Sequence, residues 1–354
     1  MNPAPTVVSH LGAVPVGADH PPVVIAEMSG NHDGSLDKAL DIVRAVADSG
    51  AQVLKLQTYT ADTITIRSDS APFRVSSGHE LWGGRTLYEL YEQAHTPWEW
   101  HEPIFELARD LGLEVFSSPF DPTAVDLLSS LGAPAFKIAS SELVDLPLIR
   151  RVAETGKPVI ISTGMGTLAE IDAAVAAARG TGNEHVIVLA CTASYPAPPE
   201  ESNLRRIPVL ADALDLQVGL SDHTLGIGVA VAAIALGAVI VEKHVTLDRD
   251  GGGVDAAFSL QPEELAALRR ETEAAWRGLG AAVIGPTEHE RETLRFRRSL
   301  FVVEDVRTGD LVTAENVRSI RPAGGLPADD FSRVAGRSFR ADVSRGTPLS
   351  WDMV

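Results

Sequence analysis

From residue 23 onward, short apolar runs rich in β-branched residues alternate with amphipathic stretches of helical periodicity. Apolar runs of this length, bounded by turn residues, are typical of buried strands. The eight strand candidates are VVIAEM (23–28), QVLKLQTY (52–59), EVFSSPF (114–120), AFKIAS (135–140), PVIIST (158–163), VIVLACTA (186–193), QVGLSDH (217–223) and VIVEKHV (239–245). Because strand–helix units repeat in this order, the pattern predicts an α/β fold, the (β/α)8 or TIM barrel.

Two predicted helices have clear start signals. Thr96-Pro97 and Asp121-Pro122 each place a capping residue before a proline, which favours a helix beginning at the proline. The alternative fold is a doubly wound open sheet. It is disfavoured because the first strand–helix turn lacks the G-x-G-x-x-G pattern of dinucleotide-binding sheets.

Nearly every predicted strand turns polar at its carboxyl end. The stretch VIVEKHV is the clearest case, since Glu242, Lys243 and His244 interrupt an otherwise buried run. Burying three ionisable groups is costly unless each has a partner or a task. Active sites of (β/α)8 barrels lie at the carboxyl ends of the strands. We therefore expect these residues to face a shared polar pocket at the barrel mouth.

A longer insertion, residues 60–95, follows the second predicted strand. The insertion and the residues just after it contain Trp82, Trp98 and Trp100, three of the five tryptophans, together with Tyr88 and Tyr91. Long loops over a barrel mouth are usually functional lids. The aromatic residues could equally pack a small core within the lid, and the two interpretations are compatible.

The pattern changes after the eighth predicted helix. A polar connector, GPTEHERETLRFRR, is followed by short strands and Gly/Pro turns. We expect a barrel domain over 1–280, a linker over 281–296 and a small, mostly β domain over 297–354. A module of that size is marginal alone and is more stable when docked on a partner.

Composition narrows the function. The chain has 354 residues and a net charge of -18, so nucleic acid is a poor partner and any anionic substrate needs a local cationic cluster. We expect no membrane span and no signal peptide, because the chain has neither a run of about 18 apolar residues nor a basic-then-apolar leader. The single cysteine, Cys191, excludes an internal disulfide and suits the cytoplasm.

Two histidines are candidate metal ligands. His223 and His244 end consecutive predicted strands. Adjacent strands are about 4.8 Å apart, so both rings could bind one divalent metal, with water and a carboxylate completing the shell. Mn²⁺, Fe²⁺ and Zn²⁺ suit such ligands. The alternative is that both are hydrogen-bonded barrel residues.

Further polar residues at strand ends could bind an anion or move protons. Lys55 and Lys137, with the hydroxyls of Ser118, Ser140 and Ser162, suggest a phosphate or carboxylate cradle, although salt-bridged structural lysines are the alternative. Glu27 and Glu142 are candidates for acid–base work or for binding substrate hydroxyls. Asp255 follows three glycines that would allow its loop to close over a ligand. Cys191 is interpreted as a small buried apolar residue, and His32 as a hydrogen-bonding loop residue.

These stretches together resemble the sialic acid synthase family over nearly the whole chain. The matching motifs are IAEMSGNHDGSLDKAL, KLQTYTADT, FSSPFD, FKIASSEL, ISTGM, CTASYP, GLSDHTLG, VEKHVTLD and GGVDAAFSL. The segment RRSLFVVEDVRTGDLVTAENVRSIRPAGGL resembles the antifreeze-like (SAF) domain that follows the barrel in that family.

The resemblance implies condensation of phosphoenolpyruvate with an N-acetylated aldose, giving a nine-carbon 2-keto acid and phosphate. It implies a divalent metal, Mn²⁺, at His223 and His244, and Glu27 as general acid–base. The implied phosphoenolpyruvate site comprises Lys55, Ser118, Lys137, Ser140, Glu142, Ser162 and Ser221. Gln57, Tyr195, Asp255 and Arg321 would contact the sugar. Arg321 would come from the partner subunit, which implies a domain-swapped homodimer.

The aromatic lid resembles that of the members that form pseudaminic acid. Ala193 stands where neuraminate-forming members carry Asn in a Cys-Thr-Asn motif, which also indicates a different sugar. The alternative acceptor is a mannose-configured N-acetyl sugar, converted to N-acetylneuraminate or legionaminate. Less favoured are a 3-deoxy-sugar-acid phosphate synthase, a metal-dependent hydrolase, and a non-catalytic sugar- or ice-binding protein.

Overall fold

A closed barrel of eight parallel strands forms the centre of the first part of the chain, in the order β10-β3-β4-β5-β6-β7-β8-β9. The computed structural model describes residues 8, 10–76 and 82–354. The strands are β3 (Val23–Glu27), β4 (Val53–Thr58), β5 (Glu114–Pro119), β6 (Phe136–Ile138), β7 (Val159–Ser162), β8 (Val186–Cys191), β9 (Gln217–Ser221) and β10 (Ile240–His244). The predicted (β/α)8 barrel is confirmed.

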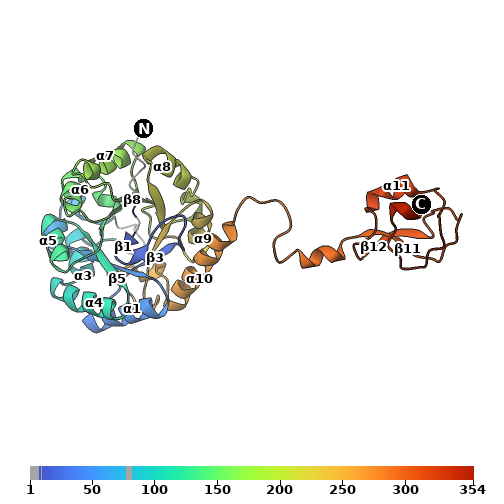
Figure 1. Ribbon diagram of the computed structural model, residues 1–354. Coiled ribbons are helices and arrows are strands. Elements are labelled where there is room, and N and C mark those ends of the chain that lie inside the picture. Colours follow the sequence, from blue (N-terminus) through green and yellow to red (C-terminus); the bar gives the residue numbers. More distant parts are fainter. Residues whose placement is uncertain (1–7, 9, 77–81) are drawn as a thin grey trace. The chain divides into compact units, whose positions relative to one another are not determined.

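Helices surround the strands as an outer ring, seen along the barrel axis in Figure 1. They are α1 (Leu36–Asp48), α4 (Trp98–Asp110), α5 (Pro122–Ser130), α6 (Leu146–Ala153), α7 (Leu168–Arg179), α8 (Arg206–Leu214), α9 (Gly228–Ala235) and α10 (Pro262–Leu279). The Asp121 carboxylate accepts the N–H groups of Thr123 and Ala124, so α5 begins at Pro122 as predicted. By contrast, α4 begins one residue later than predicted, with Pro97 as its N-cap.

Several strands are shorter than the apolar runs that predicted them. Strand pairing ends at Ile138 in β6, at Cys191 in β8 and at Ser221 in β9. The polar residues that follow leave the sheet and form the loops of the barrel mouth. The mouth loops after β6, β8 and β10 contain the 3-10 helices η2 (Ser140–Glu142), η3 (Pro199–Glu201) and η4 (Ala256–Phe258), respectively.

An antiparallel hairpin that the sequence did not predict, β1 (His10–Leu11) and β2 (Val14–Pro15), precedes the barrel. Leu11 is fully buried in the barrel core, and the N–H of Ala13 donates to Glu114 Oε1 at 2.7 Å. Since Glu114 is the first residue of β5, the hairpin lies at the amino ends of the strands. It therefore covers the barrel end opposite the predicted site.

The predicted lid contains α2 (Ala61–Ile64), η1 (Ala71–Phe73) and α3 (Leu87–Ala94), and its residues 77–81 lie outside the described residues. Tyr88 is buried, donates its hydroxyl to Asp62 Oδ1 at 3.2 Å and lies under the Arg67 guanidinium. The insertion thus has an aromatic packing centre of its own.

Chain contacts divide the protein into two units, Met1–Gly280 and Ala281–Val354. In the second unit, β11 (Ser299–Val302) pairs antiparallel with β12 (Val317–Ile320). Short helices complete it: η5 (Glu292–Phe296), η6 (Ala328–Asp330), α11 (Phe331–Val334) and η7 (Trp351–Met353). Its core is built around Leu300, Val302 and Phe339.

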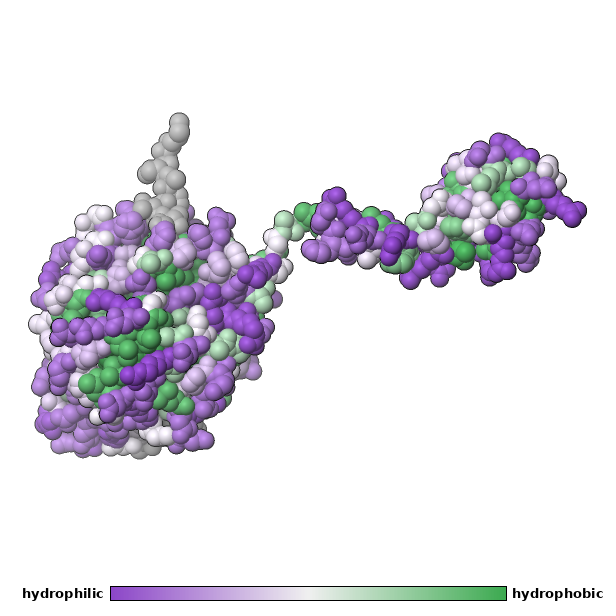
Figure 2. All heavy atoms as spheres, turned by 60° about the horizontal axis from the view of Figure 1, so that its bottom comes forward, coloured by the Kyte–Doolittle hydropathy of each residue, from purple (hydrophilic) through white to green (hydrophobic). Residues whose placement is uncertain are grey.

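The surface is largely hydrophilic on the face of each unit seen in Figure 2, with an apolar band across the barrel unit. No helix in the described part of the chain is long and apolar enough to cross a membrane.

Candidate active site

The alternation of side chains along β10 explains the ionisable run at its end. Glu242 and His244 face the barrel interior, where they contact residues from other strands. Lys243 points the other way and contacts Asp222 and Thr224. Successive side chains of a strand point to opposite faces. Two of the three groups therefore belong to the polar interior, and the third lies behind it.

Four buried charged residues from β3, β4, β6 and β10 form a cluster at the mouth, here called the Glu–Lys cluster: Glu27, Lys55, Lys137 and Glu242. Lys55 Nζ lies 2.9 Å from Glu27 Oε2 and 3.0 Å from Glu242 Oε1. Lys137 Nζ lies 3.7 Å from Glu242 Oε1 and donates to Ser162 Oγ at 2.6 Å. Two cations thus face two anions, so both lysines are salt-bridged, which is the alternative that the sequence left open beside the anion cradle.

The two lysines differ in their electrostatics. Burial lowers the pKa of Lys55, but Glu242 and Glu27 outweigh it and raise that pKa above its usual value. Burial dominates at Lys137 and lowers its pKa, because Glu242 is farther away and Lys55 repels it. Lys137 is consequently the ammonium group that a bound anion would stabilise more.

Glu27 joins the Glu–Lys cluster to the histidines. Gln57 Nε2 donates to Glu27 Oε1 at 2.8 Å, and Glu27 Oε2 lies 3.2 Å from His244 Nε2. Burial alone would raise the pKa of Glu27, but His244, Lys55 and Gln57 outweigh it and hold the pKa well below its ordinary value. Glu27 is therefore a carboxylate at neutral pH.

The rings of His223 and His244 lie side by side with their centroids 5.4 Å apart. His223 Nδ1 lies 2.9 Å from the carbonyl oxygen of Thr192, which can only accept, so in the neutral ring Nδ1 carries the proton and Nε2 has the lone pair. In the same way, Glu27 takes the N–H of His244 Nε2. His244 Nδ1 is buried without a hydrogen-bond partner in the described residues.

These donor atoms fit a divalent metal. Two imidazole nitrogens with free lone pairs lie near the Asp255 carboxylate, whose Oδ2 is 3.7 Å from His244 Nδ1. Within the described ranges, no three His, Cys, Asp or Glu side chains converge as a complete metal centre. Water or substrate would have to supply the remaining ligands.

Asp255 is held by the loop after β3. Ser29 Oγ donates to Asp255 Oδ2, and the Asp255 N–H donates to Asn31 Oδ1 at 3.2 Å. Asn31 Nδ2 in turn donates to the carbonyl oxygen of Val245 at 2.8 Å. Burial raises the pKa of Asp255 above its ordinary value, with His244 acting against this. These bonds fix the loop after β10 at the mouth.

Tyr195 covers the histidines. Its ring centroid lies 4.3 Å from that of His223, 5.3 Å from that of Phe258 and 5.9 Å from that of Trp82. Trp82 also donates its Nε1–H to the carbonyl oxygen of Val254 at 3.0 Å. The lid thus reaches the mouth through Trp82, whereas Trp100 packs against His32.

The serines predicted to bind an anion lie around the same mouth. Ser118 Oγ is buried without a partner in the described residues, and Ser221 Oγ donates to Glu242 Oε1 at 3.0 Å. Ser140 Oγ accepts the N–H of Gly164 at 3.1 Å.

Glu142 lies near the same mouth. Burial raises the pKa of Glu142 to about 7 against the opposing effect of Lys137. The Oε2 atom of Glu142 is buried without a hydrogen-bond partner among the described residues.

The interpretation of Cys191 as a small buried apolar residue missed its contacts with polar residues of the site. It is buried, as expected, but its Sγ lies 3.5 Å from Ser140 Oγ and 3.9 Å from His223 Nδ1. The available signal was its place at the end of the sixth predicted strand. His32 agrees with its interpretation as a loop residue, since its Nδ1 accepts the N–H of Gly34 at 3.1 Å.

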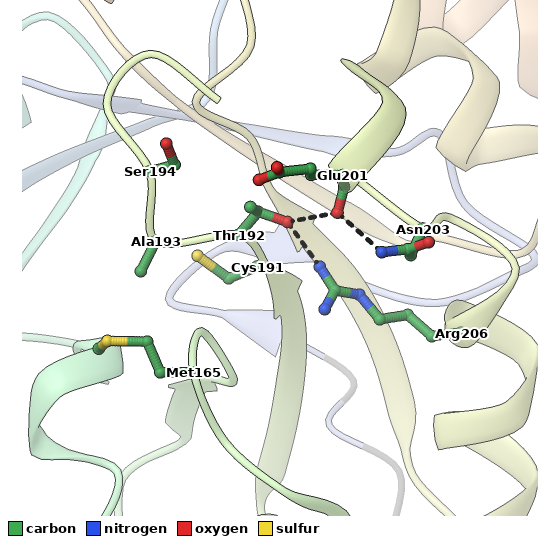
Figure 3. A pocket seen from close by; sticks show the side chains of 8 residues that line it. All are labelled: Met165, Cys191, Thr192, Ala193, Ser194, Glu201, Asn203 and Arg206. Carbon is green, nitrogen blue, oxygen red and sulfur yellow. Dashed lines mark hydrogen bonds between the residues drawn. The ribbon is translucent and has the colours of Figure 1, made fainter. Parts of the chain in front are cut away.

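A cavity of about 370 Å³ opens beside the end of β8. Figure 3 shows Met165 and Ala193 on one side of it, and Thr192, Asn203 and Arg206 on the other. Cys191, Ser194 and Glu201 complete the lining.

Arg321 belongs to the other unit. It directly follows β12 and is exposed there. The role expected for Arg321 at a barrel mouth stays a prediction.

Comparisons with known proteins agree with this architecture. The NeuB family matches residues 42–283, and the SAF domain matches residues 297–354. The chain is 38% identical to a pseudaminic acid synthase of Helicobacter pylori over 334 residues, covering 94% of this chain and 97% of that protein. It is 39% identical to a pseudaminic acid synthase of Campylobacter jejuni over 326 residues, covering 92% and 94%.

A solved structure extends the likeness to three dimensions. The spore coat polysaccharide biosynthesis protein spsE of Bacillus subtilis matches with a TM-score of 0.65 and 31% identity, covering 98% of both chains. The family match spans most of the barrel, and the similarity to the synthases spans both units. The chain therefore belongs to the NeuB family.

Proposed function

We propose that this protein condenses phosphoenolpyruvate with 2,4-diacetamido-2,4,6-trideoxy-altropyranose and water, giving pseudaminic acid and phosphate. In the open-chain sugar, C3 of phosphoenolpyruvate forms a bond to the aldehyde carbon, the C=O π bond opens, and its oxygen takes up a proton to become a hydroxyl. Water adds to C2, and the bond between C2 and the phosphate oxygen breaks. The reaction is a transfer of the EC 2.5.1 type.

One observation carries the proposal. A buried Glu–Lys cluster and a histidine pair share the mouth of a barrel whose relatives, at 38–39% identity, include pseudaminic acid synthases. Such a site can bind an anionic substrate beside a carboxylate that accepts protons.

Phosphoenolpyruvate would bind over Lys55 and Lys137. Each ammonium group has three N–H donors, so both can contact an anion while keeping the ion pairs described above. The hydroxyls of Ser118, Ser140, Ser162 and Ser221 would supply neutral donors. Glu142, with a pKa raised to about 7, can donate from its protonated form near neutral pH.

Glu27 would take the proton of the water that adds to C2. Its carboxylate is kept ionised by Lys55 and His244 and is oriented by Gln57. Positive charge developing at C2 acidifies the attacking water, so a carboxylate is a sufficient acceptor.

His223 and His244 would hold a divalent metal, in our proposal Mn²⁺, which when bound supplies Lewis-acid polarisation of the sugar aldehyde. The carbonyl of Thr192 and the carboxylate of Glu27 fix the two ring orientations. Gln57, Tyr195 and Asp255 would orient the sugar.

We further propose that the working unit is a cytoplasmic, domain-swapped homodimer in which Arg321 of the partner subunit contacts the sugar. The exposure of Arg321 outside the barrel unit supports this arrangement. The single free cysteine suits a reducing compartment.

The test is phosphate release from phosphoenolpyruvate with Mn²⁺ and three parallel acceptors. These are the altrose-configured 2,4-diacetamido sugar, its mannose-configured counterpart and N-acetylmannosamine. Turnover with the altrose sugar alone is the expected result. Turnover only with a mannose-configured sugar would favour the neuraminate or legionaminate alternative. No phosphate with any acceptor, from folded and metal-loaded protein, would refute the synthase.

A further inference from the structure

The cavity beside β8 has two chemically different sides. Met165, Cys191 and Ala193 form an apolar side, with Met165 from the loop after β7 (Figure 3). The opposite side is polar: Thr192 Oγ1 donates to the carbonyl of Glu201 and accepts from Arg206 Nη2, both at 3.0 Å.

Arg206 supplies the cationic donor group on the polar side, where its Nη2 reaches Thr192 Oγ1. Its Nε is buried and has no hydrogen-bond partner within the described residues. No carboxylate in the described part of the chain forms an ion pair with it. The cavity therefore offers the Nη groups of Arg206 opposite an apolar wall, and Arg206 is the one Lys or Arg among the residues that line the cavity.

The cavity adjoins the histidine pair through Thr192. The carbonyl of Thr192 holds His223 while its side chain lines the cavity. Cys191 also lines the cavity, and its Sγ lies 3.9 Å from His223 Nδ1, so the cavity and the histidine pair are neighbours at the end of β8.

We propose that this cavity binds an acetamido group of the acceptor, with the methyl on Met165 and Ala193 and the carbonyl oxygen on Arg206. This rests on the proposed function and names the part of the sugar that the cavity selects. An acetamido group matches a cavity with one apolar side and one open donor. A phosphorylated substituent would meet a single cation beside a carboxylate, which is a poor phosphate site.

Ala193 is the residue whose size we expect to set the space available in the cavity. The Ala193 methyl packs close to Gly164, because a Cβ placed on Gly164 would lie only 2.9 Å from the Ala193 Cβ. Since Ala193 lines the cavity and has little room on the side of Gly164, a larger side chain at 193 would take up part of the cavity.

The test compares two acceptors that differ only at C4, where one has an acetamido group and the other a hydroxyl. We expect Ala193→Leu to raise KM for the diacetamido acceptor by about tenfold and to change KM for the hydroxyl acceptor much less. Arg206→Met should also raise KM for the diacetamido acceptor more than KM for the hydroxyl acceptor. Ala213→Leu, at an exposed position of α8 outside the cavity, is the matched control.

Acceptor binding is also measured by ligand-observed NMR, so that the cavity is judged without turnover. Selective loss of binding of the diacetamido acceptor supports the proposal. If folded Ala193→Leu binds both acceptors equally more weakly, or binds both as tightly as wild type does, the proposal is overturned. Wild-type protein that binds the acceptors but releases no phosphate would refute the proposed function alone.

A separate observation concerns Lys243, which is almost fully buried behind the barrel interior. Its Nζ lies 2.9 Å from Asp222 Oδ2 and donates to the carbonyl of Thr224 at 2.6 Å. Asp222 Oδ1 accepts the N–H of Thr224 at 2.9 Å. These bonds tie together the two residues that flank His223.

We infer that Lys243 is a positioning residue for His223. It lies between Glu242 and His244 on β10, so one strand presents His244 and also fixes the turn that presents His223. The two rings are thereby held in register by an ammonium group that touches neither of them. Residues that orient metal ligands are typically worth about 10- to 100-fold in metal affinity.

The experiment measures Mn²⁺ binding to Lys243→Met, Lys243→Arg and the control Lys157→Met, whose lysine is exposed. We expect Lys243→Met to weaken Mn²⁺ binding by about 10- to 100-fold, with partial recovery in Lys243→Arg. The His223 ring resonances of the metal-free protein should shift as well. If Lys243→Met does not fold, Asp222→Asn removes the same ion pair at constant size. Unchanged Mn²⁺ affinity and unchanged His223 resonances in a folded variant would overturn the inference.

Discussion

The rings of His223 and His244 lie 5.4 Å apart, with their planes inclined by 62°, and each is held by a different acceptor. A backbone carbonyl holds His223, and the carboxylate of Glu27 holds His244. Since both acceptors belong to barrel strands or to the residues that directly follow them, the pair is oriented before any ligand binds. This preorganisation underlies the predictions below.

Removing one ring should abolish metal binding. We expect His244→Ala to lose phosphate release and to lose the rise in Tm that Mn²⁺ gives the wild-type protein. Metal at about 100 times its Kd stabilises a native state by about 2.7 kcal/mol. His185→Ala, at an exposed histidine, should keep both properties. Full activity in folded His244→Ala would contradict the metal role.

Chelation gives a second test of the metal. We expect EDTA to stop phosphate release and Mn²⁺ to restore it, because the described residues supply only part of a metal's ligands and would hold the metal reversibly. Turnover that persists after exhaustive chelation, with metal analysis showing none bound, would exclude metal-assisted condensation.

The carboxylate of Glu27 should matter more for turnover than for binding. We expect Glu27→Gln to lower kcat by about 10²- to 10⁴-fold, the usual contribution of a general base, with a smaller change in the KM for phosphoenolpyruvate. Glu106→Gln, at an exposed glutamate on α4, is the control for loss of one charge. A kcat within about twofold of wild type would remove Glu27 from the proton transfer.

Glu142 should make stability depend on pH. Its folded pKa, about 7, lies above the ordinary 4.5, so the folded state binds more protons than the unfolded state between these values. Stability from this group is present below pH 4.5 and is lost as the pH rises to about 7. We therefore expect Glu142→Gln to have a higher Tm than wild type at pH 8 and a similar Tm near pH 4, measured by calorimetry. Equal Tm differences at both pH values would contradict the raised pKa.

We expect the lid to affect binding of the acceptor sugar through Trp82. Trp82→Phe keeps an aromatic ring near Tyr195 but loses the hydrogen bond to the carbonyl of Val254. We expect KM for the sugar to rise by about 2- to 10-fold, the typical worth of one hydrogen bond, and KM for phosphoenolpyruvate to stay unchanged. Trp100→Phe, in a helix of the outer ring, should change neither value.

The apolar periodicity was sufficient to predict the eight strands, their order and the polar mouth. Buried β-branched runs with helical stretches between them have few other ways to bury their apolar faces. The placement of His223 and His244 at consecutive strand ends followed from the same pattern. The β1–β2 hairpin was missed because runs of two residues carry no periodic signal.

The amino-acid sequence could not predict which charged residues of different strands form ion pairs. Glu242 and Lys243 are adjacent in sequence, yet one pairs with Lys55 inside the barrel and the other with Asp222 behind it. Which face each residue takes depends on the register of β10 against β3, where His244 pairs with Glu27. A shift of one residue would exchange the two faces. Barrel closure fixes that register, and so the tertiary structure alone decides which charges meet at the mouth.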